Sequence, residues 1–521
     1  MNFSKISRRD FHTLFGTAMG TAVLGGIPVI AQAAGTTNSP SAMVPKKGGR
    51  VRLALAQQST NDTFDSARFT NANDYIRGSA VFNTLTRVDG SGQAQPELAL
   101  SWEANPSATE WRFKIRKGVE FSDGQPLSLQ DIAFSIMRHK NEGKASSAKP
   151  LVANIAAVTT EGDDTILVRL AEADVELPVL LGLLQFCVVK DGTEDFSKPI
   201  GTGPFVMAEF QPGIRTVLTR NTNFWKDGQP YLDEIEMISI TDANARVSAL
   251  LSGDIDMAAD LKGAGIDQVA ANPSTKIFET PSTRYAGYQF DAATNFDPNL
   301  GLAIANMFDR PKIVETVLKG HGSVANDHPV GKMSPYYNAN LPQRELDLDK
   351  AKHYLKKSGI GRTPLELSVS DGVVYSVEIA QLLQRSAAQA GLNLTLRREP
   401  SESYWTAVAG KRRFFATNFF PRPTPHLLLN VTWKSGSQWN FSHYGNPRLD
   451  SLIDGVRATL DVDKRIAMYH EIQEILHNCG AVTMPVFLSY LDGVSSRIQG
   501  LTPNQIGNFS GFRFSDQVWL S

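Results

Sequence analysis

An arginine flanked by prolines is the first candidate for ligand chemistry. Arg422 lies between Pro421 and Pro423 and is therefore not expected in a helix. Its guanidinium prefers a carboxylate or a phosphate, which it grips through two parallel hydrogen bonds. An arginine at the solvent-exposed surface is the equally weighted alternative. If Arg422 binds a ligand, that ligand should carry an acidic group.

Aromatic rings and an amide follow Arg422 in the sequence. Trp433, Trp439 and Asn440 combine rings that exclude water with a group that fixes orientation. Packing in the core is the alternative, and for Trp439 with Asn440, in a predicted loop, the two interpretations weigh equally. Tyr404 and Trp405 are weaker candidates of the same kind, and the hydroxyls of Ser59 and Thr60, after the first predicted strand, are weaker candidates still.

Motifs for enzymatic catalysis are missing from the sequence. No Gly-x-Ser-x-Gly, Gly-Lys-Ser/Thr, Cys-x-x-Cys or His-Glu-x-x-His motif occurs. His470-Glu471 comes nearest to a zinc helix, but Glu474 stands where the second histidine is needed. The nine histidines are scattered. We therefore expect no catalytic residue, no metal site and no cofactor.

Composition and charge are typical of a globular chain with several lobes. The 521 residues exceed one ordinary core, and the chain is 42% apolar and 20% charged. A formal net charge of -1 makes nucleic acid an unexpected partner. Only Cys187 and Cys479 occur. A disulfide between them and two buried free thiols are both open, with the thiols favoured.

The first residues predict an export signal. Arg8-Arg9 precede an apolar stretch, and Ala31-Gln32-Ala33 has the small-x-small form of a cleavage site. Residues 1–34 are therefore predicted to be a signal peptide of twin-arginine type, although His12 stands where an apolar residue is usual. A membrane anchor is the disfavoured alternative. The mature chain is expected in the periplasm.

Apolar periodicity predicts alternating strands and helices. Strands are expected at 48–55, 111–116 and 365–369. Ser128 with Asp131 predicts a capping box, and Asn446-Pro447 predicts a second helix start. Further helices are expected at 349–358 and 463–480. This mixture predicts an α/β fold.

Several segments, all in one order, resemble extracellular solute-binding proteins of family 5, which serve peptide, nickel and opine importers. The most specific is 111–124, Trp-Arg-Phe-Lys-Ile-Arg-Lys-Gly-Val-Glu-Phe-Ser-Asp-Gly. The others are 48–49, 81–85, 96–103, 201–205, 220–225, 249–256 and 309–314. Together they cover essentially the whole mature chain.

The resemblance implies a bilobal, clamshell fold of the periplasmic-binding-protein type, with an extra small domain on the first lobe. The expected parts are lobe I at 46–84, 196–284 and 489–521, an extra subdomain at 85–195, and lobe II at 285–488. Two strands, near 284–288 and 485–488, are expected to cross the hinge.

The resemblance also implies where the ligand binds. In this family the ligand lies between the lobes and touches the second lobe at a loop after a strand, which corresponds here to 418–425. Asn418 and Phe420 therefore join Arg422 as expected contacts. Peptide-binding members usually have an aspartate there for the peptide amine, whereas this stretch has no acid. The departure speaks against a peptide, but peptides, opines, sugar conjugates and other small polar solutes all stay open.

The implied function is that of a non-enzymatic binding component of an ABC importer. It captures a small polar solute and delivers it to permease subunits in the inner membrane, and it is expected to be a monomer. Two alternatives are a periplasmic hydrolase and a ligand-sensing protein on the same fold. The hydrolase needs a nucleophile, base or metal cluster that the sequence does not display, whereas the sensor cannot be separated from the transport protein by sequence.

Overall fold

The computed structural model describes residues 44–294 and 296–521. Residues 45–521 form one compact unit. The predicted signal peptide, residues 1–34, lies outside the described residues. Within the described part, no helix has the length and apolar character needed to cross a bilayer.

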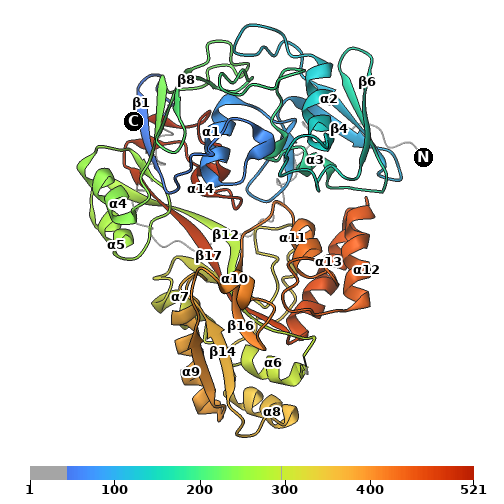
Figure 1. The fold of residues 1–521 in the computed structure, drawn as a ribbon, viewed down its shortest axis with the longest axis vertical. Helices are drawn as coiled ribbons and strands as arrows, with labels where there is room; N and C mark the ends of the chain where they lie inside the picture. Colours follow the sequence, from blue (N-terminus) through green and yellow to red (C-terminus); the bar gives the residue numbers. More distant parts are fainter. Residues whose placement is uncertain (1–43, 295) are drawn as a thin grey trace, which may run out of the picture. The chain divides into compact units, whose positions relative to one another are not determined.

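One mixed sheet extends through most of the unit (Figure 1). Its strands are β1 (Arg50–Leu55), β8 (Phe205–Gln211), β9 (Arg215–Arg220), β10 (Glu234–Ser239), β11 (Met257–Ala258), β12 (Thr275–Phe290), β13 (Gly322–Val324), β14 (Leu365–Val369), β15 (Leu394–Arg398), β16 (Phe414–Phe419) and β17 (Val482–Ser495). Their order is β15-β14-β16-β12-β17-β11-β1-β10-β9-β8, and β13 pairs with β17. The strand predicted at 48–55 is confirmed as β1, which begins two residues later at Arg50, and the strand predicted at 365–369 is confirmed as β14.

The long antiparallel strands β12 and β17 connect two lobes. Their pairing runs from Thr275 with Ser495 to Gln289 with Val482, and the register shifts between Thr280 and Arg284. The predicted crossing segments, 284–288 and 485–488, lie within these strands. The register shift interrupts the ladder where the strands pass from one hydrophobic core to the next.

Lobe I is the part built around the core of β1, β8–β11 and the first half of β12. Its helices are α1 (Ala72–Val81), α4 (Ala243–Ser252) and α5 (Ala264–Ala271), with the short turn α14 (Asn508–Gly511). Buried residues at its centre are Val51, Leu53, Phe64, Phe82, Ile235 and Met257. A small pair of strands, β18 (Ile498–Gln499) and β19 (Trp519–Leu520), completes this lobe near the C-terminus.

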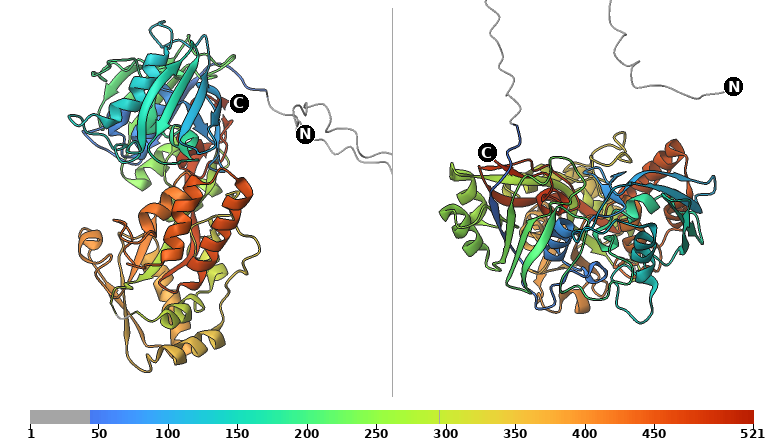
Figure 2. Two further views of the ribbon diagram at one scale, coloured as in Figure 1. Left: turned by 90° about the vertical axis from the view of Figure 1, so that its right-hand side faces the viewer. Right: turned by 90° about the horizontal axis from the view of Figure 1, so that it is seen from above.

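A separate four-stranded sheet forms the extra subdomain (Figure 2). It contains β4 (Ala99–Ala104), β5 (Glu110–Ile115), β7 (Thr165–Leu170) and β6 (Ile155–Glu161), in that order. Helix α2 (Leu129–Met137) covers it, and the predicted capping box of Ser128 and Asp131 is confirmed. A hairpin of β2 (Thr86–Val88) and β3 (Ala94–Pro96) and the short helix α3 (Leu177–Leu180) lie beside it. Trp111 and Phe113 belong to its core, as a structural interpretation of the 111–124 motif requires.

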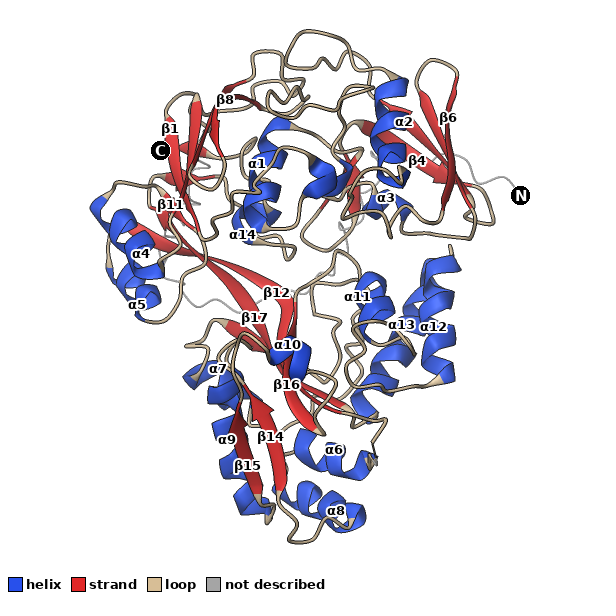
Figure 3. Cartoon of the chain, in the orientation of Figure 1, coloured by secondary structure: helices blue, strands red, loops and turns tan. Residues whose placement is uncertain are grey.

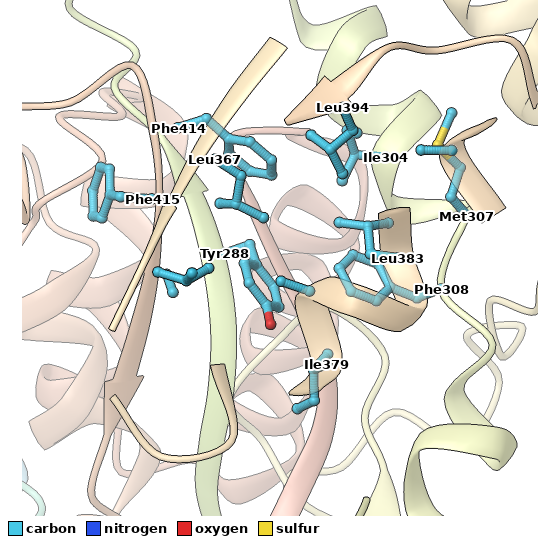
Figure 4. Close-up of a cluster of buried hydrophobic side chains, with 14 of the residues drawn as sticks. Tyr288, Ile304, Met307, Phe308, Leu367, Ile379, Leu383, Leu394, Phe414 and Phe415 are labelled. Atoms are coloured by element: carbon cyan, nitrogen blue, oxygen red, sulfur yellow. The ribbon is translucent and has the colours of Figure 1, made fainter. Parts of the chain in front are cut away.

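Lobe II carries most of the helices. They are α6 (Pro298–Ala305), α7 (Arg310–Thr316), α8 (Leu348–Ser358), α9 (Ser376–Ala390), α10 (Tyr404–Ala407), α11 (Pro425–Thr432), α12 (Pro447–Ala458) and α13 (Val462–Asn478). One hydrophobic cluster packs Tyr288, Phe308, Leu367, Leu383 and Phe414 between the sheet and its helices (Figure 4). A second cluster lies under α11, α12 and α13, which stand side by side (Figure 3).

The predicted helix starts in lobe II are confirmed by their caps. Asn446 caps α12 through its side chain, with Pro447 as the first helical residue. Gly359 ends α8 with a left-handed φ of 66°, a conformation that glycine adopts without strain. The exact lobe boundaries given above, 46–84, 85–195, 196–284, 285–488 and 489–521, stay predictions.

The two cysteines are buried free thiols, the favoured of the two alternatives. Cys187 lies in the core of lobe I, and Cys479 lies just after α13 in lobe II. Burial raises the pKa of Cys187 to about 12 and that of Cys479 to about 11, so both are protonated and unreactive at neutral pH.

Candidate ligand-binding site

Arg422 lies in the loop between β16 and α11, and its charge has no acidic partner in the described residues. Its guanidinium carbon is 5.6 Å from the centre of the Trp439 ring. Burial lowers the pKa of Arg422, and only the phenols of Tyr75 and Tyr490 oppose that effect. The side chain still reaches solvent. A guanidinium that is partly desolvated and unpaired is suited to an incoming anion.

Tyr75 of lobe I lies near enough to Arg422 for the charge of the arginine to act on its phenol. It lies in α1 of lobe I, where burial raises its pKa to about 12 and the nearby charge of Arg422 lowers it in part. Its hydroxyl accepts a hydrogen bond of 2.9 Å from Nε2 of Gln185. Its ring packs against Phe512 at 5.5 Å between centroids. The groups around Arg422 therefore come from both lobes.

A second arginine, Arg284, lies in β12 where pairing with β17 resumes after the register shift. The guanidinium carbon of Arg284 is 5.0 Å from the centre of the Phe420 ring and 5.9 Å from that of Tyr490. Phe420 begins the same loop as Arg422 and is 56% exposed, whereas Tyr490 of β17 is buried. The loop thus contributes one member to each of two arginine–aromatic pairs, Arg422 with Trp439 and Phe420 with Arg284.

The space beside Arg422 is lined by both lobes. A cavity of about 20 Å³, near the size of one water molecule, is bounded by Ser91, Gln505, Thr283, Ser334 and Arg422 among others. The backbone of Gly92 also lies close to the loop of Arg422, because a Cβ atom at Gly92 would lie 2.1 Å from the carbonyl oxygen of Pro423. Any solute larger than water therefore needs the loop or the lobes to move apart before it can enter this cavity.

Besides Arg422, two of the predicted contacts are exposed and three are buried. Trp439 is 38% exposed beside Arg422, and Phe420 lies beside Arg284. The exceptions, Tyr404, Trp433 and Asn440, are buried in lobe II. Their side chains pack inside lobe II, and the expectation that they contact the ligand stays a prediction.

The buried positions follow from satisfied polar groups and packing. The Tyr404 hydroxyl donates to the carbonyl of Ala416 at 2.8 Å. The Asn440 amide donates to the carbonyl of Tyr444 at 2.9 Å and accepts from the Ser442 hydroxyl at 2.8 Å. Trp433 is 1% exposed in the cluster under α11. The burial of Trp433 therefore fits the alternative interpretation, in which its ring packs in the core.

Of the three remaining candidates, Asn418 and Ser59 are half-buried and Thr60 is exposed. Asn418 is the second-to-last residue of β16, pairs with Ala286 of β12 and is half-buried, with an Oδ1 atom that has no hydrogen-bond partner. Ser59 and Thr60 lie in the loop after β1, where the Ser59 hydroxyl accepts from the backbone of Asn61 at 3.1 Å. We find no contact that joins Ser59 or Thr60 to Arg422 in the described part of the chain.

Sequence reasoning did not identify Tyr75, Arg284 or Tyr490 as site residues. Tyr75 belongs to a helix of mixed polar and apolar residues, and Tyr490 to a buried strand. Arg284 had a usable signal, because a charged residue directly precedes an apolar strand that was expected to cross the hinge.

A larger depression, of about 500 Å³, lies elsewhere on lobe II. It is polar and open, and it is lined by α6, the segment before α8 and the end of α13, including Asn306, Arg344, Asp347 and His477. None of its lining residues comes from lobe I or from the loop of Arg422. In the described residues, no group of three or more His, Cys, Asp and Glu side chains is arranged to hold a metal ion.

Comparisons with known proteins agree with this architecture. Residues 93–441 match the family model of "Bacterial extracellular solute-binding proteins, family 5 Middle". The chain is 26% identical over 475 residues to the probable di/tripeptide-binding protein 5 of Pseudomonas aeruginosa (strain UCBPP-PA14). This match covers 82% of this chain and 88% of the relative. It is 25% identical over 446 residues to the nickel-binding periplasmic protein of Escherichia coli (strain K12), covering 80% and 84% respectively.

Solved structures show the same fold. The structure of HbpA2 from Haemophilus parasuis matches with a TM-score of 0.81 and 20% identity, over 91% of this chain and 100% of the other. The fold is therefore the bilobal α/β fold of periplasmic binding proteins.

Proposed function

Because this chain belongs to the bacterial extracellular solute-binding proteins of family 5, we propose that it captures a small solute with an acidic group, held by Arg422, for import across the inner membrane. Members of the family bind small ligands and work with ABC permeases, and this chain is a solute-binding protein of that kind. The acidic group is the part of the proposal that rests on this chain's own residues.

The unpaired guanidinium of Arg422 carries the proposal. A charge that is partly removed from water without a partner raises the free energy of the ligand-free state. A carboxylate or phosphate offers two oxygens in the geometry of the guanidinium fork. Trp439 already lies against the same guanidinium and can pack on the apolar part of the solute.

A solute captured between the lobes can contact both Arg422 and the nearby Tyr75. The Tyr75 hydroxyl accepts from Gln185 and keeps its own proton to donate to a solute oxygen. A solute held by Arg422 in lobe II and Tyr75 in lobe I stabilises the arrangement in which the lobes meet. Lobe closure of this kind supplies affinity without covalent chemistry.

We infer that the solute is delivered unchanged by a monomeric protein in the periplasm. The twin-arginine signal is tested by Arg8→Lys with Arg9→Lys, since normal periplasmic levels of that variant contradict it. Incubation with the solute tests delivery, because an altered solute mass after incubation contradicts it. A sedimentation measurement that finds a dimer contradicts the monomer.

Native mass spectrometry of protein purified from its own periplasm identifies the co-purifying solute, which we expect to contain a carboxylate or phosphate. Calorimetry with that solute then tests Arg422→Gln. Loss of a desolvated charged contact costs about 2–5 kcal/mol, so affinity should fall by a factor of roughly tens to thousands.

The matched control is Arg385→Gln, which removes one positive charge from the exposed face of α9. It should bind as the wild type does. A neutral solute, or unchanged affinity in Arg422→Gln, contradicts the proposal.

A further inference from the structure

We propose that Arg284 forms a second anion-binding subsite in the same cleft, so that the solute carries two acidic groups. The inference rests on the proposed function, in which Arg422 binds the first acidic group. It adds a residue of the lobe-connecting strand β12 to a site otherwise built from the loop after β16.

The first observation is the environment of the Arg284 side chain. Its guanidinium lies over Phe420 and Tyr490, with 5.0 Å and 5.9 Å to the ring centres. Its Nε atom is buried and has no hydrogen-bond partner. The aromatic rings stabilise the positive charge from their faces but cannot accept its N–H bonds. The donors of the guanidinium fork are therefore left for another acceptor.

The second observation is that nearby acids are engaged elsewhere. Asp260 and Asp492 influence the pKa of Tyr490 together with Arg284. The Asp260 carboxylate pairs with Lys262 at 3.0 Å. The Asp492 carboxylate accepts from Asn508 at 2.6 Å and from the Phe509 backbone at 3.1 Å. In the described chain, neither carboxylate lies within ion-pair distance of Arg284.

The third observation is the closeness of the two arginine–aromatic pairs. Phe420 and Arg422 are separated only by Pro421, and prolines at 421 and 423 hold this segment extended. Alternate residues of such a segment are roughly 6–7 Å apart at Cα. The charges of both Arg284 and Arg422 also lower the pKa of the same phenol, Tyr490. Two unpaired guanidinium groups thus share one end of the cleft.

A solute with two acidic groups fits this arrangement. One group pairs with Arg422 and the other with Arg284, while Phe420 and Trp439 pack against the apolar chain between them. A solute with a single acidic group leaves one guanidinium desolvated without a partner, which costs affinity. The solute class is a dicarboxylate, or a carboxylate joined to a phosphate through a short linker.

Matched pairs of probes test the second subsite. We suggest the straight-chain dicarboxylates from succinate to suberate, each compared with its own monoamide, which has the same shape and one charge fewer. Calorimetry on the wild type should show at least one diacid bound about tenfold or more tightly than its monoamide. Arg284→Gln should reduce that ratio to about one and leave binding of the monoamide nearly unchanged.

Two further variants keep the test decisive. Arg284→Lys, which keeps the charge on the connecting strand, should fold as the wild type does and retain part of the diacid preference. Arg385→Gln should retain all of it. No preference for any diacid, or a preference that survives in Arg284→Gln, overturns the second subsite. Failure of the first subsite is distinguishable, because then Arg422→Gln binds the monoamides as tightly as the wild type.

Discussion

Two tryptophans on the same stretch of lobe II have opposite environments. Trp433 is 1% exposed in the cluster under α11, whereas Trp439 is 38% exposed and lies against Arg422. Large aromatic side chains in a core contribute mainly to folding, and rings at the edge of a cleft contribute mainly to binding. The pair therefore separates stability from ligand contact at the scale of single residues.

We predict different losses from the two alanine variants. Trp433→Ala should lower the free energy of unfolding by about 3–5 kcal/mol, because it removes a fully buried ring. Trp439→Ala should weaken solute binding, through lost packing and water exclusion, with little change in the melting temperature of the ligand-free protein. Thermal melts and calorimetry on both variants measure this contrast. A large drop in the ligand-free melting temperature of Trp439→Ala would place that ring in the core.

Part of the candidate site could be predicted from the local sequence, and the rest could not, for a physical reason. Arg422 was predictable because the flanking prolines exclude a helix and leave a charge in a loop. Tyr75 and Tyr490 were not, because their proximity to Arg422 depends on contacts between segments far apart in the chain. Trp433 and Trp439 look alike in sequence, and only tertiary packing separates them.

At the scale of elements, the turn α14 has an unusual backbone. Phe509, Ser510, Gly511 and Phe512 follow one another with φ of 46°, 63°, 66° and 71°. Left-handed conformations cost non-glycine residues about 1–2 kcal/mol each. Asp492 of β17 offsets part of this cost, because its carboxylate accepts from the Asn508 side chain and the Phe509 backbone. Phe512 in turn packs on Tyr75.

The Asp492 carboxylate should make stability depend on pH. Burial raises its pKa from 3.8 to about 7, so between these values the folded state binds more protons than the unfolded state. Its contribution to the free energy of unfolding is therefore present at low pH and is lost, by a few kcal/mol, as pH rises from about 4 to 7.

We predict that Asp492→Asn removes this contribution. The variant loses one accepted hydrogen bond at every pH, so it should be less stable than the wild type at pH 4.5, and the difference should shrink toward pH 7.5. Thermal melts of both proteins across this pH range measure the difference between their free energies of unfolding. The other titrating groups are the same in both proteins, so their effects cancel in this difference. A constant difference contradicts the shifted pKa.

Elements with local caps were predictable, whereas α14 was not. Ser128 and Asn446 mark helix starts because their side chains bond the first turn of the same helix. The left-handed turn contains two phenylalanines and a serine, residues that avoid positive φ on their own. It is stabilised by Asp492 of β17, whose carboxylate accepts hydrogen bonds from this turn.

At the scale of the whole unit, the extra subdomain is joined to lobe II by polar contacts. Oε2 of Glu176, at the start of α3, accepts from the Thr424 hydroxyl at 2.6 Å and lies 3.2 Å from Nδ1 of His426. Nε of Arg457 in α12 donates to Asp174 at 3.1 Å. These contacts form on the α11 side of the cleft, next to the loop of Arg422, so they can form fully only when the lobes meet.

We predict that these contacts favour the closed arrangement and thereby raise solute affinity. Charge-assisted hydrogen bonds and partly exposed ion pairs contribute roughly 0.5–2 kcal/mol here, so Glu176→Ala with Arg457→Gln should weaken binding by roughly 2- to 30-fold. The ligand-free double variant should also show a larger radius of gyration in small-angle scattering, because more molecules are open.

The matched control for this last prediction is Arg448→Gln. It breaks an ion pair of 2.6 Å with Glu471 that lies within lobe II, between α12 and α13. Because this pair does not cross between lobes, its loss should change neither the radius of gyration nor the affinity. If the double variant behaves like this control, the contacts at Glu176 and Arg457 follow closure without favouring it, and the solute contacts alone hold the lobes together.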